Sequence, residues 1–412
     1  MQSTRLNFLF HHTSSSLLDI KRQLFAIRYV SALEGLFIDS AVFYLHDNLV
    51  GEARKIEGLT ELPFQVDFIS SQNEVAQTSA DIVIRMNTLD HLNLKFFRDY
   101  SRLFMRKDPV GGILMASRNC VGFASDGEFS SSSIIRGFAS RVVRDVKVSM
   151  SDRVQVDTSS DRQRCIVFVD FKRMLPELER FSRVAIRVVI KAERWARRLI
   201  NQGVKLVQRI AVPFVGHTIQ SGIFTGATIG LGYGSSHTAK IYGSYEECIQ
   251  LYFKDLALRH SIFLDYGCAD GYYLIGYKHL NPEGKVYGLD ISDVALERAR
   301  SACSEFSHCE IKHSDGSLDQ ISSHGEALIM LDCEGYEYQL LLENDLTSLE
   351  LSSLIIEDHY FMAGHAPFEL AVKLEKTHKV RLVIPETNAG LFKKELRHPH
   401  SFFLICEKKQ RQ

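Results

Sequence analysis

The stretch Ser261–Tyr273, SIFLDYGCADGYY, contains a short apolar run, an aspartate and two glycines. Ile262–Leu264 is apolar and partly β-branched, which is typical of a buried parallel strand. Gly267 and Gly271 permit positive φ and let the backbone pass close to a ligand, because they have no Cβ. The residues that follow, Tyr272–Leu280, predict a helix. A strand, a glycine turn and a helix N-terminus together predict a ligand cradle at the carboxyl end of a sheet.

This glycine turn differs from the turn of a dinucleotide-binding site. That site has the pattern G-x-G-x-x-G, whereas Gly267 is followed here by Cys268, Ala269 and Asp270, so the middle glycine is missing. Asp265 ends the apolar run and can accept hydrogen bonds from an amino group. The turn therefore favours a cationic or amine-bearing ligand end over a pyrophosphate.

Four more strands are expected after this turn, and acidic residues stand at their carboxyl ends. Asp290 lies 25 residues after Asp265, about the spacing of an acid that binds a ribose diol. The expected strands are Lys285–Asp290, Glu310–Gly316 (with Asp315), Glu326–Gly335 (with Asp332, Cys333 and Glu334) and Leu354–His359. Strands that alternate with helical stretches and end in acids predict a doubly wound α/β sheet with an adenosine-type ligand.

These motifs resemble those of the class I S-adenosylmethionine-dependent methyltransferases. LDYGCADGYY, VYGLDIS and HSDG follow one another in the order of that family. MLDCEGYEYQLL followed by IIEDH is more narrowly similar to the FkbM-type branch, whose fourth strand typically ends in D-x-E-G. The resemblance covers roughly Tyr242 to Cys406. It implies a Rossmann-like methyltransferase sheet of seven strands.

The resemblance also implies which residues bind S-adenosylmethionine. Asp265 and the glycine turn would line the methionine end, Asp290 would hold the ribose hydroxyls, and Asp315 with Gly316 would lie beside the adenine. The full expected set is Asp265, Gly267, Cys268, Ala269, Gly271, Tyr272, Asp290, Ile291, Asp315 and Gly316. Tyr242–Glu246 is expected to pack over the cofactor, with Glu246 as a weaker candidate contact. The sequence departs from the family pattern at Cys268 and Asp270, where glycine or alanine is usual.

Methyl transfer to a hydroxyl requires a group that removes the proton. Asp332, Glu334 and His359 are the candidate catalytic residues, because they fall at or just past the ends of expected strands. Asp332 could be the base, or could hold a divalent cation that acidifies the hydroxyl. His359 could be the base, since its usual pKa suits that task, or a hydrogen-bonded residue of the pocket wall. Glu334 could instead be an N-cap or first-turn acid of the next helix.

The composition indicates a two-domain chain that carries almost no net charge. The 412 residues are 45% hydrophobic, which is enough for two cores. Lys and Arg number 49 against 50 Asp and Glu, so nucleic acid is not an expected partner. The eight cysteines form no C-x-x-C pair, which favours reduced thiols in a cytoplasm. We see no signal-peptide pattern in Met1–Ser16 and no apolar run near the ~20 residues that span a bilayer.

The N-terminal half, residues 1–170, predicts a second α/β domain. The expected strands are Leu6–Phe10, Ala41–Leu45, Phe64–Ile69, Asp81–Met86 and Gly112–Ala116, and the clearest helices are Leu17–Leu33 and Leu94–Phe104. ADIVIRMNTLDHLNLKFFRDYSRLF and GGILMASRN faintly resemble the back half of sugar O-methyltransferases. The serines of HHTSSS predict either a helix cap or a site for an anion such as a nucleotide-sugar phosphate.

Residues 171–240 are expected to link this domain to the methyltransferase domain, residues 241–412. Within the linker, Arg180–Arg209 carries nine basic residues and one acid, Glu193. Such a segment is either an interdomain helix or a basic amphipathic helix that lies on the inner face of a membrane. The glycine-rich TGATIGLGYGSS that follows favours a flexible connection or a loop over the active site.

The expected function is O-methylation of a sugar or polysaccharide-type hydroxyl, with a small molecule or glycan as acceptor. One alternative is a bifunctional glycan-assembly enzyme with an N-terminal glycosyltransferase-like domain; a D-x-D metal motif would favour it, and residues 1–170 contain none. Another alternative is a non-catalytic S-adenosylmethionine-binding protein. Asp332 and Glu334 argue against it, because binding alone does not need them.

Overall fold

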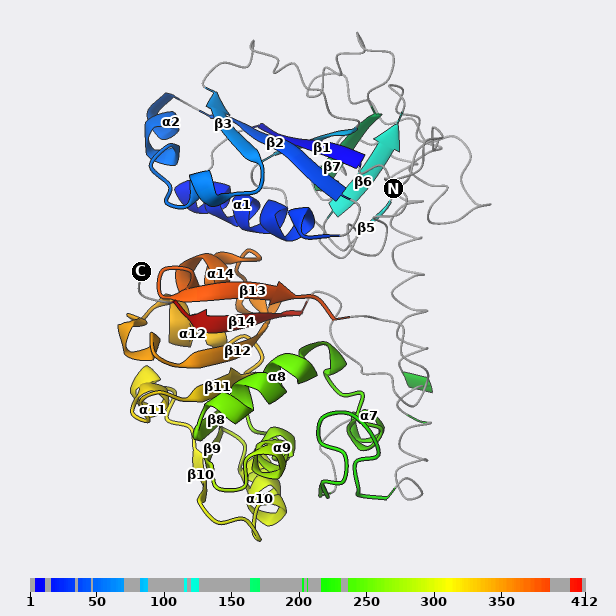
Figure 1. Cartoon of the computed structure of the whole chain (residues 1–412), viewed down its shortest axis with the longest axis vertical. Helices are drawn as coiled ribbons and strands as arrows, with labels where there is room; N and C mark the ends of the chain where they lie inside the picture. Colours follow the sequence, from blue (N-terminus) through cyan, green and yellow to red (C-terminus); the bar gives the residue numbers. More distant parts are fainter. Residues whose placement is uncertain are drawn as a thin grey trace. The chain divides into compact units, whose positions relative to one another are not determined.

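The computed structural model describes residues 4–11, 16–33, 36–45, 47–69, 82–87, 115–116, 120–125, 164–170, 202–203, 206, 216–230, 236–385 and 401–409. The chain divides into two compact units, Met1–Ala196 and Arg197–Gln412. Each unit contains one seven-stranded sheet (Figure 1). The division falls within the stretch that the sequence predicts as a linker.

The first unit is an α/β domain, as the sequence predicts. Its strands are β1 (Thr4–His11), β2 (Leu36–Tyr44), β3 (Gln65–Ile69), β4 (Ile82–Asn87), β5 (Met115–Ala116), β6 (Cys120–Ser125) and β7 (Arg164–Asp170). They lie in the order β3-β2-β1-β4-β7-β6-β5. Strand β6 is antiparallel to β5 and β7, and the other neighbours are parallel. The strands predicted from the sequence do not include β6 and β7.

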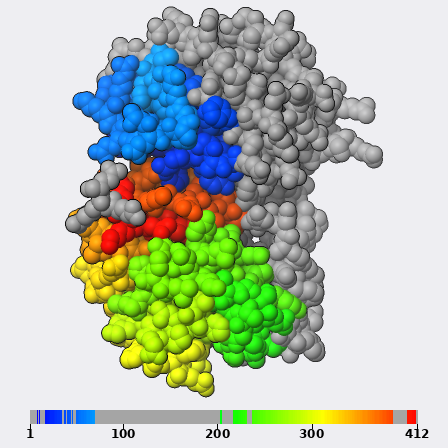
Figure 2. Space-filling view, in the orientation of Figure 1, coloured from blue at the N-terminus to red at the C-terminus, as the bar shows by residue number. Residues whose placement is uncertain are grey.

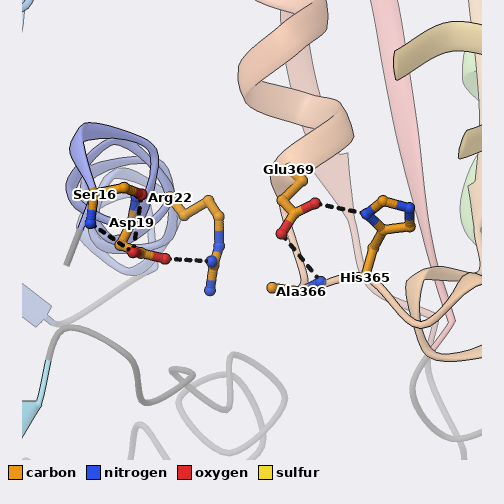
Figure 3. A network of polar contacts seen from close by, with 6 residues as sticks. All are labelled: Ser16, Asp19, Arg22, His365, Ala366 and Glu369. Carbon is orange, nitrogen blue, oxygen red and sulfur yellow. Dashed lines mark hydrogen bonds and ion pairs between the residues drawn. The ribbon is translucent and has the colours of Figure 1, made fainter. Parts of the chain in front are cut away.

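Helix α1 (Leu17–Ser31) begins at a capping box. Ser16 Oγ accepts a hydrogen bond from the Asp19 backbone N–H at 3.3 Å, and the Asp19 carboxylate accepts one from the Ser16 N–H at 2.9 Å. Arg22 Nη1 donates to the same carboxylate at 2.7 Å (Figure 3). The cap predicted for the serine run is confirmed at Ser16. The unit also contains α2 (Asp47–Ala53) and the 3₁₀ turn η1 (Leu59–Glu61).

The second unit has the Rossmann-like sheet that the resemblance implies. Its strands are β8 (Ile262–Tyr266), β9 (Lys285–Asp290), β10 (Cys309–His313), β11 (Leu328–Leu331), β12 (Ser353–Asp358), β13 (His378–Val383) and β14 (Phe402–Lys408). Their order is β10-β9-β8-β11-β12-β14-β13. Strand β14 runs opposite to the other six strands. Strands β9 and β10 are added on one side of β8, and β11 and β12 on the other. This reversal of the strand order opens a ligand crevice between β8 and β11.

Two groups of helices cover this sheet (Figure 1). The helices are α7 (His237–Ile241), α8 (Glu247–Arg259), α9 (Tyr272–Leu280), α10 (Asp293–Ala302), α11 (Leu318–Ser322), α12 (Glu337–Leu342), α13 (Tyr360–Ala363) and α14 (Glu369–Leu374), with a 3₁₀ turn η2 (Thr347–Leu349). Because parallel crossovers are right-handed, the helices that follow β8 and β9 cover one face, and the helix that follows β11 covers the other.

Residues 216–230, which the sequence places in the linker, pack into the core of the second unit. Ile219, Phe224, Ala227 and Ile229 are buried there. The Phe224 ring makes edge contacts with Phe253 and Tyr272, with centroids 5.5 and 5.3 Å apart. The space-filling view shows the green residues near the start of this unit in continuous contact with the yellow-green residues that follow (Figure 2).

Some sequence predictions fall on residues that the structure does not describe. These are the helix Leu94–Phe104, the glycine-rich residues 231–235 and, apart from residues 202–203 and 206, the basic segment Arg180–Arg209. The membrane contact of that segment stays a prediction. Among the described helices, none combines the length and the apolar character needed to cross a bilayer.

Candidate active site

The predicted site residues of strands β8, β11 and β12 meet at one edge of the second sheet. Strand β11 lies between β8 and β12 and pairs in parallel with both. The glycine turn after β8, Asp332 after β11 and His359 after β12 therefore emerge side by side. This edge includes the crevice between β8 and β11.

Gly267 brings the glycine turn into backbone contact with the end of β11. Its φ is +94°, and a Cβ on it would lie 2.0 Å from the Asp332 carbonyl oxygen. The backbone N–H groups of Gly267 and Cys268 both donate to the Leu289 carbonyl, at 2.7 and 3.1 Å, which ties the turn to β9. The turn then enters α9 at Gly271, which has a φ of +80°. The turn is thus a cradle that a side chain at Gly267 would fill.

We expect Gly267→Ala to lower the free energy of unfolding by more than ~2 kcal/mol, because a positive φ alone costs a non-glycine residue about 1–2 kcal/mol. Displacement of the Asp332 carbonyl adds to that cost. Gly325→Ala is the control, since Gly325 also has a positive φ, +72°, but nothing lies within 4 Å of its added Cβ. Urea unfolding of both variants measures the difference. Equal losses of stability would contradict the close backbone approach at Gly267.

Asp290 holds the glycine turn from the β9 side. Its Oδ2 accepts a hydrogen bond from the Ala269 N–H at 3.0 Å, and its Oδ1 accepts one from the Ser292 N–H at 2.8 Å. A carboxylate has about four lone-pair sites, so acceptor capacity remains for a ribose diol. Ile291, the next residue, is 75% exposed and offers an apolar surface beside this acid. The pair fits the nucleoside end of S-adenosylmethionine.

Asp265 is a buried carboxyl group to which no residue in the described part of the chain donates a hydrogen bond; its exposed fraction is 3%. Burial raises its pKa to about 8, with further increases from the charges of Glu246 and Asp290 and a decrease from Lys240. A ligand end that carries a positive charge and N–H donors would satisfy this group. The methionine end of S-adenosylmethionine has that chemistry.

Cofactor binding at pH 7 should therefore release about one proton per site. Asp265, with its pKa of about 8, is protonated in the free protein, and a cationic ligand favours its ionised form. The affinity should rise with pH up to about 8 and level off above it. Calorimetry in buffers with different enthalpies of ionisation measures the proton release, and Asp265→Asn should abolish it. The same release in Asp265→Asn would rule out this assignment.

The acid at Asp270, unusual for the family, has a partner that the sequence did not reveal. Lys240 Nζ donates to both of its carboxylate oxygens, at 2.7 and 2.8 Å, and both side chains are buried. The same ammonium lies 5.0 Å from the Tyr245 ring centroid and 5.2 Å from that of Tyr272. This ion pair fastens the segment before β8 to the glycine turn. The signal for this pairing that the sequence offers is Lys240 itself, a lysine in a helix that the structure buries.

Glu246 is a buried acid beside the glycine turn. It is 1% exposed, has a φ of +50°, and accepts a hydrogen bond from the Tyr273 hydroxyl. Its charge raises the pKa of Asp265. The prediction that Tyr242–Glu246 packs over the cofactor stays a prediction, and Glu246 is the member of that segment whose charge acts on the cradle.

Four other residues of the expected cofactor set contribute to the hydrophobic core or to the turn before α11. The Cys268 and Tyr272 side chains belong to the hydrophobic core, and burial raises the pKa of the Cys268 thiol. Asp315 accepts hydrogen bonds from the Ser317 N–H and hydroxyl at 2.8 and 2.7 Å, which lower the pKa of its carboxyl group. The Gly316 carbonyl accepts a hydrogen bond from the Tyr336 hydroxyl at 3.1 Å. Asp315 thus orders the turn that enters α11.

His359 lies buried among four carboxylates. Its Nδ1 is 2.7 Å from Glu337 Oε1, and its Nε2 is 3.5 Å from Glu357, 3.8 Å from Glu334 and 3.9 Å from Asp332. Burial lowers the pKa of the imidazole, but the Glu337 hydrogen bond and the carboxylate charges outweigh it and raise the pKa to about 9. A group that keeps its proton at neutral pH is a poor base, so the geometry favours the pocket-wall alternative for His359.

Glu337 and Glu357 are the site residues of this cluster that sequence analysis missed. Helix α12 begins at Glu337, so its first-turn acid is Glu337 and not Glu334. Glu334 has a φ of +52° and a side chain that is 73% exposed. All six residues of β12 are buried. A glutamate within an apolar strand is unusual, and this is the signal by which the sequence could have indicated Glu357 as a site residue.

One family of known proteins matches part of the second unit. Residues 259–324 match the family described as "Methyltransferase domain". That segment contains the cradle, the Asp290 strand and the Asp315 turn. No curated protein matches the chain.

Several solved methyltransferase structures are similar to part of this chain. Precorrin-6y C5,15-methyltransferase of Geobacter metallireducens GS-15 is 14% identical with a TM-score of 0.29, over 40% of this chain and 89% of that one. WbdD is 17% identical with a TM-score of 0.31, over 41% and 44% of the two chains. Fibrillarin of Aeropyrum pernix, with natively bound S-adenosyl-L-methionine, is 10% identical with a TM-score of 0.25, over 35% and 64%. Sequence identities and TM-scores this low do not indicate the substrate.

The strand order, the cradle and the family match define the second unit as a class I methyltransferase domain. The protein is an S-adenosylmethionine-dependent methyltransferase. S-Adenosylmethionine is its cofactor, and the cradle residues described above fit it.

Proposed function

We propose that the protein methylates a hydroxyl group of a sugar or polysaccharide-type acceptor. The observation that carries the proposal is the position of Asp332. Its backbone carbonyl touches the glycine turn at Gly267, and its side chain is 28% exposed. A carboxylate beside the methyl-donor cradle and open to solvent can serve an acceptor that must lose a proton. The D-C-E-G sequence at this position supports the FkbM-type assignment.

In this proposal the chain mainly binds and aligns the reactants. S-Adenosylmethionine, when bound, supplies an electrophilic methyl carbon. Asp265 and Asp290 hold the two ends of that cofactor, and the backbone at Gly267 leaves room for it. Asp332 is the residue on which removal of the hydroxyl proton depends. Alignment of the acceptor oxygen with the methyl group can supply several kcal/mol of rate enhancement, about 7 or more in favourable cases.

Incubation with methyl-labelled S-adenosylmethionine and a panel of sugars, nucleotide sugars and lipid-linked glycans tests the acceptor class. We expect label in an alkali-stable methyl ether. Asp345→Asn is the control for the removal of the Asp332 carboxylate in Asp332→Asn. Asp345 is an exposed residue that accepts hydrogen bonds from Thr347. Label that appears only on nitrogen, or cofactor that binds without any transfer to these acceptors, would contradict the proposal.

A further inference from the structure

We propose that Asp332, Glu334 and His359 bind a divalent cation at the carboxyl edge of the second sheet, with Glu337 as the positioning residue for His359. The inference deepens the proposed function, because such an ion would hold and acidify the acceptor hydroxyl. The cluster follows two strands that pair in parallel, β11 and β12. The sequence alone predicts only that Asp332 could hold an ion.

The distances within this cluster suit shared coordination better than direct hydrogen bonding. One ligand atom from each of Asp332, Glu334 and His359 lies within 4.8 Å of the other two. His359 Nε2 is 3.8 and 3.9 Å from the two carboxylates, too far for an N–H···O bond of about 2.7–3.2 Å. Metal–ligand bonds of about 2.0–2.2 Å place two ligands of one ion roughly 3–4 Å apart. One ion would bridge the observed gaps.

His359 supplies an independent sign of a ligand. Its side chain is 5% exposed, and within the described part of the chain its Nε2 makes no hydrogen bond. Its Nδ1 is held by Glu337, whose side chain has no exposed surface. A carboxylate that fixes one imidazole nitrogen while the other faces acidic oxygens is the arrangement that orients a metal-binding histidine. The geometry directs Nε2 at the site, where a bound cation would displace its proton and take up its lone pair.

The cluster also brings several acids close together. Glu357 faces His359 Nε2 at 3.5 Å, and its side chain is 8% exposed. Glu246, Asp332 and Glu357 form a second group whose ligand atoms lie within 4.8 Å of one another. Buried carboxylates this close repel one another, and a divalent cation between them would reduce that repulsion.

The donor set narrows the choice of cation. One imidazole nitrogen and two carboxylate oxygens suit manganese, iron or zinc better than calcium. Glu334 is 73% exposed and Asp332 28% exposed, so one side of the site is open to solvent. An open coordination position is what a catalytic ion needs for an acceptor oxygen. Mn²⁺ is therefore the probe of choice.

Mn²⁺ binding to the full chain, followed by electron paramagnetic resonance, tests the inference. We expect one site per chain. Glu334→Gln and His359→Gln should each weaken it at least tenfold, and Glu337→Gln should weaken it about 10- to 100-fold. The exposed Glu334 keeps the test valid if His359→Gln fails to fold. His365→Gln is the matched control, since His365 Nδ1 bonds Glu369 at 2.8 Å in a separate pair (Figure 3); its affinity should be unchanged.

The Co²⁺ absorption spectrum separates ligands from the positioning residue. His359→Gln should lose the band of imidazole coordination, whereas Glu337→Gln should keep it at a higher Co²⁺ concentration. The same weak affinity in His365→Gln as in His359→Gln would overturn the assignment. So would the absence of a stoichiometric Mn²⁺ site in the parent protein, or equal affinity in the parent and in all three site variants.

Activity assays distinguish this inference from the proposed function. Mn²⁺ that binds as expected while no hydroxyl is methylated would support the ion site and contradict the proposed acceptor. Hydroxyl methylation that persists in a chelator, with no Mn²⁺ site in the protein, would contradict the inference and leave the proposed function in place.

Discussion

Asp332→Asn should bind S-adenosylmethionine within a few-fold of the parent affinity, while its turnover falls by about 10²–10⁴. The cradle depends on the backbone of Asp332, not on its carboxylate. The Asp332 N–H donates to the Tyr266 carbonyl at 3.0 Å, and its carbonyl packs against Gly267. Asparagine preserves both contacts. It removes the negative charge that either takes up the hydroxyl proton or holds an ion.

Single-turnover rates with methyl-labelled cofactor measure this effect independently of product release. A chelator arm separates the two roles of Asp332. If the residue holds an ion, activity in the parent protein disappears with the chelator and returns with Mg²⁺ or Mn²⁺. If it is the base, the chelator has no effect and only Asp332→Asn is slow. Full activity in Asp332→Asn, with or without chelator, would refute both roles.

The second large effect is expected at Asp290. Asp290→Ala should weaken S-adenosylmethionine binding by roughly 30- to 1000-fold, or about 2–4 kcal/mol. The variant loses the acceptor for the ribose and also frees the Ala269 and Ser292 N–H groups that the carboxylate now holds. The glycine turn would lose one of its three hydrogen bonds to β9, since the other two go to the Leu289 carbonyl.

Asp293→Ala is the matched control for this prediction. Asp293 is an exposed acid three residues away, in the first turn of α10. Its removal changes the local charge by the same amount without touching the cradle. Equilibrium dialysis with labelled cofactor gives both affinities. A comparable loss in the two variants would show that general electrostatics, and not the ribose contact, determines the affinity.

The parallel part of the methyltransferase sheet could be predicted from the sequence because local signals mark it. Buried strands are continuous apolar runs, and the glycines and acids mark where they end. The expected strand Lys285–Asp290 and helix Tyr272–Leu280 have the bounds of β9 and α9. β13 and β14 were not placed individually. They pair antiparallel, and their partners are decided by tertiary contacts.

In the site, too, some residues are marked by local sequence signals, whereas others are brought together only by tertiary contacts. Asp265, Asp290 and Asp332 follow strands, so their common edge could be inferred from the fold class. Lys240 pairs with Asp270, thirty residues along the chain. Glu337 meets His359 only because α12 and the end of β12 come together. No local pattern encodes these pairings, because they depend on how helices pack against the sheet.

The most direct test of the account is a calorimetric titration of S-adenosylmethionine into the full chain. We expect one binding site per chain in the parent protein, retained in Asp332→Asn and strongly weakened in Asp290→Ala. A parent protein that binds no S-adenosylmethionine would contradict the assignment of the second unit as a functional methyltransferase domain. Equal affinity in the parent and in Asp290→Ala would contradict the placement of its cofactor site at the carboxyl edge of the sheet.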